Sequence, residues 1–110
     1  MAKNRRKIDY EESSGNVFAD LGLPNPEQEL LKANLTVQIF RAIKARKLTQ
    51  AKAGKILGIA QPHVSDLMRG RARAFSTERL MQFLAALGHD VEIRVKRTRK
   101  EHGQVSVVAA

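Results

Sequence analysis

The chain of 110 residues contains no cysteine and no tryptophan, and one tyrosine and four phenylalanines are its only aromatic residues. Without cysteine there is neither a disulfide framework nor a thiolate zinc site. Three histidines are scattered along the sequence and form no metal-binding motif. No apolar run approaches the ~18 residues that suggest a membrane helix, and no segment resembles a signal peptide. We therefore expect a soluble, cytoplasmic protein without a metal, a cofactor or a membrane partner.

Catalytic motifs are also missing. The sequence has no glycine-rich phosphate loop, no histidine–carboxylate spacing of a metalloenzyme, and no nucleophile with a nearby base. The chain is therefore predicted not to be an enzyme. Its apolar content of 43% is enough to form one modest core, which suits a single small domain.

Positive charge is the property that the sequence has in excess, with a formal net charge of +9. Residues 44–73 hold eight lysines or arginines against one acid, which is a net charge of +7. Residues 1–30, in contrast, carry four basic and six acidic side chains, which is a net charge of −2. A positive field concentrated on one segment is typical of a protein that binds a phosphate backbone.

The same basic segment contains the run TQAKAGKILGIAQPHVSDLMRG, whose spacing is typical of two short helices joined by a sharp turn. Thr49 is a good N-cap residue and predicts a helix over residues 50–57. Gly58 suits the left-handed conformation in which many helices end. Apolar residues spaced three apart then predict the inward face of a second helix over residues 61–69. The remaining side chains of this second helix are polar and face outward.

The pattern TQ-x3-G-x3-GI-x-Q-x2-VS-x-L-x-RG resembles the helix-turn-helix of lambda-type phage repressors and XRE regulators, over about residues 48–88. The resemblance implies that the second helix enters the major groove of double-stranded DNA with its N-terminal end. The implied base-reading residues are Gln61, Pro62 and Asp66. The implied contacts to the DNA backbone come from Gln50, His63, Ser65, Lys47, Lys52, Lys55, Arg71 and Arg73.

Chemistry supports these roles to different degrees. The Gln61 amide suits a bidentate contact with adenine, and the Asp66 carboxylate suits the amino group of cytosine. Asp66 fits equally well in a surface ion pair with Arg69, one helical turn away. Two positions depart from the family pattern, which usually has alanine at Gly54 and a serine or threonine cap at Ala60. We therefore expect the second helix to start less firmly.

Apolar spacing predicts two further helices on either side of this motif. The first begins with Asn25 as a cap and Pro26 at the first helical position, and continues to about residue 47. Its core-facing residues are Leu31, Leu35, Ile39 and Ile43. The second begins at the cap residue Ser76 and ends at Gly88.

These elements predict a mostly α fold, a lambda-repressor-like helix-turn-helix bundle of four to five helices with a C-terminal β-strand. Residues 1–24 are expected to form an N-terminal arm with a short helical turn. Residues 25–96 would form the DNA-binding domain with a dimerisation strand, and residues 97–110 a basic tail.

The strand is predicted from the period-two pattern of residues 90–96, DVEIRVK, in which Val91, Ile93 and Val95 share one face. A lone strand cannot satisfy its backbone hydrogen bonds, so it needs a partner. The same strand of a second subunit could pair with it across a two-fold axis, or residues 104–108 could fold back as a hairpin. We favour the homodimer, because two-fold dimers are the commonest oligomers and helix-turn-helix dimers read paired half-sites.

The segments NVFADLGLPNPE and FSTERLMQFLAALGHDVEI, together with the helix-turn-helix, resemble the HigA-type antitoxins of bacterial toxin–antitoxin pairs. This resemblance implies a repressor of its own operon that also neutralises a small RNA-cleaving toxin of the HigB type. Val17, Phe18 and Leu21 would then bind the toxin, or they would cover the core of their own domain.

Two other functions are compatible with parts of this sequence. A plain, phage-like XRE regulator without a toxin shares the same helical core and remains the alternative. A module for structured RNA is disfavoured, because every phenylalanine lies at an apolar position and no aromatic platform accompanies the charge.

Overall fold

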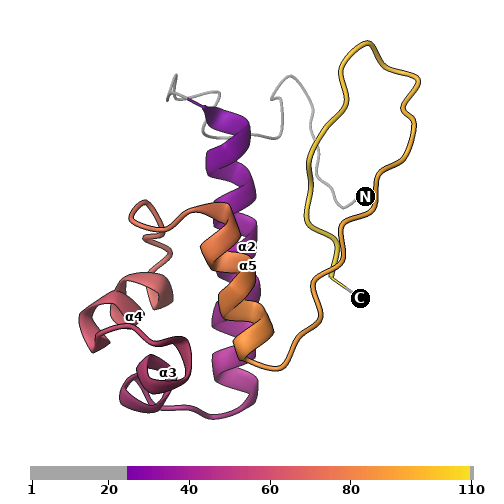
Figure 1. Cartoon of the computed structure of the whole chain (residues 1–110). Coiled ribbons are helices and arrows are strands. Elements are labelled where there is room, and N and C mark those ends of the chain that lie inside the picture. Colours follow the sequence, from indigo (N-terminus) through magenta and orange to yellow (C-terminus); the bar gives the residue numbers. More distant parts are fainter. Residues whose placement is uncertain (1–24, 110) are drawn as a thin grey trace.

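The computed structural model describes residues 25–109. Within this range the chain forms four α-helices. They are α2 (Pro26–Ala45), α3 (Gln50–Leu57), α4 (Gln61–Met68) and α5 (Thr77–Ala86). The long helix α2 forms the axis of the fold, α5 packs along it, and α3 and α4 pack on each other at one side (Figure 1). None of the described helices is both long and apolar enough to cross a membrane. The mostly helical architecture is confirmed.

The hydrophobic core lies between all four described helices. Leu35, Ile39 and Ile43 on α2 are all buried, as their four-residue spacing predicts. The largest fully buried side chains are Phe83, Ile39, Ile43, Leu67, Leu80 and Val64. Each such side chain contributes roughly 1.5–3 kcal/mol on removal from water, so this cluster holds the short helices α3 and α4 in place.

The N-terminus of α2 differs from the prediction in one respect. Pro26 does occupy the first helical turn, where its missing N–H leaves no hydrogen bond unsatisfied. Asn25, however, adopts the left-handed conformation at φ 51° and ψ 54°, and its side chain makes no capping hydrogen bond. Asn25 is therefore the N-cap residue, as predicted, but its side chain does not cap the helix, since this requires an extended backbone from which the side chain reaches the N–H groups of the first turn.

Phe40 also lies where the sequence did not place it. It is 38% exposed on the outer face of α2, where Val37 is 44% exposed. Lys44 lies over the Phe40 ring, with its Nζ 5.7 Å from the ring centroid. Phe40 is thus exposed although it lies at an apolar position of the sequence, because the core-facing stripe of α2 is narrower than the run of apolar residues on this helix.

The predicted C-terminal strand is absent from the described residues. The segment after α5, residues 89–109, has no regular secondary structure and doubles back beside α2, on the side away from α3 and α4 (Figure 1). The hairpin with residues 104–108 does not form either, although Val107 is partly buried against the core. Strand pairing requires a partner for each backbone N–H and C=O group, and this segment pairs with no strand within residues 25–109.

Candidate nucleic-acid interface

The turn between α3 and α4 is built by backbone hydrogen bonds that only a left-handed residue allows. Thr49 caps α3, and its side-chain oxygen accepts from the Lys52 N–H at 3.1 Å. Gly58 ends the helix at φ 73°. The N–H groups of Gly58 and Ile59 both donate to the Gly54 carbonyl, at 2.8 and 3.0 Å. The predicted helix boundaries at this turn are thus confirmed, and α4 leaves α3 in a defined direction.

Gly54 lies at the closest approach of α3 to the turn. A Cβ atom at this position would come within 2.7 Å of the Ile59 carbonyl oxygen and 3.4 Å of a Val64 methyl group. The first distance is shorter than side chains tolerate against backbone. The glycine therefore permits a tighter turn than alanine would at this position.

Helix α4 presents one polar face outward and one apolar face inward. Val64 and Leu67 are almost completely buried and anchor the helix to the core. At the N-terminus Gln61, Pro62 and His63 are exposed, and Ser65 is half-buried further along the helix. The His63 ring lies edge-on to Phe75, with the centroids 6.1 Å apart. The predicted base-reading end of α4 is consequently open to solvent, although Pro62 adds no hydrogen-bond donor.

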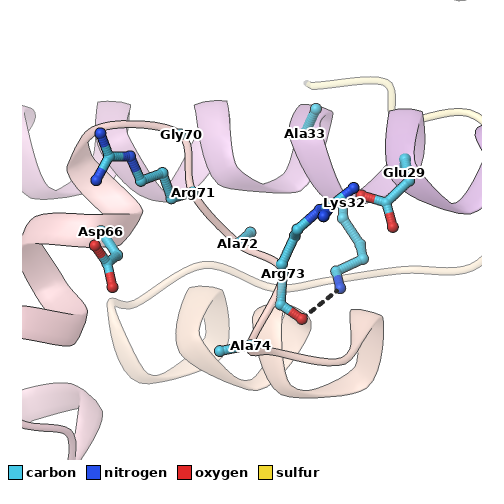
Figure 2. Close-up of a pocket in the computed structure, with 9 residues that line it drawn as sticks. All are labelled: Glu29, Lys32, Ala33, Asp66, Gly70, Arg71, Ala72, Arg73 and Ala74. Atoms are coloured by element: carbon cyan, nitrogen blue, oxygen red, sulfur yellow. Dashed lines mark hydrogen bonds between the residues drawn. The ribbon is translucent and has the colours of Figure 1, made fainter. Parts of the chain in front are cut away.

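Asp66 is placed less favourably for reading a base. It is half-buried and lines a cavity between α4, the following loop and α2 (Figure 2). In residues 25–109 its carboxylate makes no ion pair with Arg69, and its backbone carbonyl accepts from the Arg71 N–H at 2.7 Å. The structure therefore places Asp66 beside the arginine-containing loop and does not support the alternative ion pair.

The predicted backbone-contacting cations lie on the elements that precede and follow α4 in the chain. All of these cations are exposed, whereas the uncharged Gln50 is half-buried at the start of α3. The exposed cations are Lys47 before α3, Lys52 and Lys55 on α3, and Arg71 and Arg73 in the loop after α4. In the described part of the chain, the elements before and after the exposed polar end of α4 thus both carry exposed positive charge. Val17, Phe18 and Leu21 lie outside the described residues.

Comparison with known proteins agrees with this geometry. A family model described as a helix-turn-helix domain matches residues 17–96. A solved structure described as an XRE-family transcriptional regulator superimposes with a TM-score of 0.74 and 39% identity, and the match covers 79% of this chain and all of the other. The chain belongs to the XRE-like helix-turn-helix family. No curated protein matches it significantly.

Membership of the XRE-like family settles the general type of function. Proteins with this domain are DNA-binding regulators of transcription and are generally not enzymes. The expectation of a DNA-binding protein is therefore confirmed at this level. The individual base and phosphate contacts stay predictions.

Sequence reasoning missed one residue beside the site. Lys32 on α2 is only 9% exposed, and its Nζ donates to the Arg73 carbonyl at 3.3 Å. A signal for it was present, because residue 32 lies three positions before Leu35 and thus on the core-facing stripe of the helix. A lysine is unusual at such a position.

Proposed function

We propose that the chain is a sequence-specific transcriptional repressor that binds operator DNA as a homodimer. We further propose that it is the antitoxin of a HigBA-type module, which represses its own operon and binds the toxin. The observation that carries the first proposal is the exposed polar end of α4, which is preceded by α3 with its exposed lysines and followed by the loop with its exposed arginines. DNA offers hydrogen-bonding base edges between two rows of phosphates, which is the complementary arrangement.

In this proposal Gln61 reads adenine and Pro62 contacts a thymine methyl group, while Asp66 accepts from cytosine at the edge of the groove. Each good pair contributes about 1–3 kcal/mol of discrimination between bases. The backbone contacts come from the two groups of cations, with Gln50, His63 and Ser65 between them. If about 4–6 phosphates are contacted per dimer, the log–log slope of affinity against salt is about −4 to −5.

The C-terminal segment supports the homodimer. Val91, Ile93 and Val95 are 40%, 76% and 91% exposed, although their alternation is that of a half-buried strand. Pairing with the same segment of a second subunit would satisfy its backbone groups and cover these side chains. The proposed organisation is therefore an N-terminal arm at residues 1–24, a DNA-binding and dimerisation domain at 25–96, and a basic tail at 97–110.

The antitoxin role is supported by the resemblance of the chain to HigA-type proteins beyond the helix-turn-helix. The candidate toxin-binding residues are Val17, Phe18 and Leu21, which lie before the described domain. A plain XRE-family regulator without a toxin partner is the alternative. This alternative is favoured by the similarity to the solved structure, which is described as a transcriptional regulator and not as an antitoxin.

The DNA-binding proposal is tested by measuring affinity for a labelled duplex of the gene's own upstream region and for a scrambled duplex of equal composition. Gln61→Ala should reduce the ratio of the two affinities, because it removes a base contact. Arg71→Ala should weaken both affinities alike and make the salt slope about 1 smaller in magnitude per protomer. Lys44→Met is the matched control, since it removes one exposed charge from the outer face of α2. Equal binding of both duplexes by the unsubstituted protein would contradict the proposal.

The antitoxin proposal is tested with the product of the neighbouring gene. If that gene encodes a small basic protein that cleaves RNA, an equimolar amount of this chain should suppress the cleavage. Substitution of Phe18 by aspartate should restore cleavage while DNA affinity stays unchanged. Uninhibited cleavage, or a neighbouring gene of another kind, would favour the plain regulator.

A further inference from the structure

Lys32 joins the first half of α2 to the loop that carries Arg71 and Arg73. Figure 2 shows its side chain reaching from α2 to the loop, where Nζ donates to the Arg73 carbonyl oxygen at 3.3 Å. Within residues 25–109 the ammonium group makes no other hydrogen bond. This bond joins two residues that are 41 positions apart in the sequence. Lys32 is only 9% exposed as a whole residue, and it lines the cavity between α2, α4 and the loop.

A charged side chain that is mostly covered by protein loses part of its hydration, and this loss lowers the stability of the fold. One carbonyl acceptor compensates only part of the lost hydration, and Lys32 has no ion pair within residues 25–109. Methionine would fill a similar volume with an unbranched apolar chain and avoid this cost. Stability of the core alone therefore does not account for a lysine at this position.

The loop itself is held at successive residues. The Arg71 N–H donates to the Asp66 carbonyl at 2.7 Å, and Ala72 is 6% exposed, so its methyl group is buried in the core. The Phe75 N–H then donates to the Ala72 carbonyl at 3.1 Å. Arg73, the third residue of this segment, is held through its carbonyl oxygen by the hydrogen bond from Lys32.

This arrangement leaves the two arginine side chains exposed while their backbone is constrained. Ala72 points inward between them, and the Arg71 side chain points away from the contact made by Lys32 (Figure 2). A loop that is ordered before binding loses less conformational entropy when its side chains contact a ligand. A buried donor that fixes the loop would therefore strengthen every contact that the loop makes.

We propose that Lys32 is a positioning residue, which holds the Arg71–Arg73 loop in the conformation that contacts the DNA backbone. This inference rests on the proposed function of the loop arginines. In this proposal Lys32 itself does not touch DNA, because the residue is only 9% exposed and its ammonium group donates to the loop. It acts by restricting the backbone at Arg73.

The test compares Lys32→Met with Lys44→Met, which removes the same charge from an exposed position on the same helix. In the free protein, ¹⁵N relaxation should show the order parameters of the amides of residues 71–74 falling from about 0.85 to below about 0.6 in Lys32→Met only. The thermal midpoint of Lys32→Met should be equal to or above that of the unsubstituted protein. These measurements require no DNA.

Binding to the duplex of the gene's upstream region supplies the second measurement. Lys32→Met should lower the affinity about 5- to 10-fold and make the salt slope about 1 smaller in magnitude per protomer, as the loss of one phosphate contact would. The preference over the scrambled duplex should not change. In the double variant with Arg73→Ala the losses should be smaller than the sum of the single losses, because both act on the same contact.

The outcomes separate the two proposals. Unchanged order parameters in Lys32→Met, or additive losses in the double variant, would overturn the role of Lys32 while DNA binding stands. An equal loss of affinity in Lys44→Met would also overturn it, since charge alone would then explain the effect. If the unsubstituted protein binds no duplex at low salt, the proposed function fails, whatever the loop amides do.

Discussion

The missing cap of α4 allows the stability of the helix-turn-helix to be tested by adding one oxygen atom. Three helices of the domain begin at residues with nearly the same backbone conformation. Thr49 and Ser76 have φ and ψ of −74° and 162°, and −75° and 161°, and the side chain of each accepts a hydrogen bond from the N–H three residues later. Ala60 has φ −71° and ψ 152° but no side chain that can accept. Ala60→Ser should therefore place a hydroxyl group in capping geometry without moving the backbone.

The magnitude follows from the donors at the start of α4. Pro62 has no N–H, so the hydroxyl group would accept from the N–H of His63. That N–H already donates to the Ala60 carbonyl at 2.9 Å. Because the donor is not unsatisfied, the gain lies in the lower half of the usual range for N-caps, at about 0.5–1 kcal/mol. For a domain of this size, this corresponds to an increase in Tm of about 3–6 °C.

Thermal denaturation followed by far-ultraviolet circular dichroism measures this increase. Thr49→Ala and Ser76→Ala should give the opposite result, each losing about 1 kcal/mol. Ala85→Ser is the matched control, because it adds a hydroxyl group to the exposed last turn of α5, far from the free N–H groups of a helix start, and it should not stabilise the protein. If Thr49→Ala lowers the Tm but Ala60→Ser leaves it unchanged, the view that the three helix starts are equivalent is refuted.

Three further predictions concern the core, the end of α2 and the C-terminal segment. Phe83→Ala removes a side chain that is 2% exposed, and it should lower the free energy of unfolding by about 3–5 kcal/mol in urea denaturation. A loss near zero would contradict the described core. Lys47 adopts a left-handed conformation at φ 55°, which glycine tolerates better than lysine. Lys47→Gly should therefore raise the free energy of unfolding by about 1 kcal/mol in the same assay, while it weakens DNA binding. A decrease in stability would show that this conformation is not strained. Ile93→Glu should convert the proposed homodimer to monomer in sedimentation experiments without loss of helical circular dichroism, and a persistent dimer would exclude this segment as the interface.

The ends of α3, α4 and α5 could be predicted from the sequence because their causes are local. A cap at Thr49 or Ser76 acts on an N–H three residues away, and Gly58 changes the chain direction through its own backbone angle. The exposed end of α4 follows in the same way from helical periodicity, once Val64 and Leu67 face the core. The residues of the candidate DNA-binding surface on α4 were therefore within reach of sequence reasoning.

Other features depend on contacts between distant segments and could not be derived in this way. The cap role of Asn25 failed because its backbone is left-handed, and Phe40 proved exposed because packing of the other helices decides which stripe of α2 is covered. The strand at residues 90–96 has the right alternation, but a strand exists only when another segment pairs with it.

Helix boundaries and the polar face of α4 were thus determined by the sequence alone, since hydrogen bonds and side-chain periodicity within a few residues suffice for them. The placement of the arginine loop was decided only by the tertiary structure. Lys32 and Arg73 are 41 positions apart, and no local pattern shows that they meet. The meeting requires α2, α4 and α5 to form one core first, because the burial of Ala72 brings the loop to the helix.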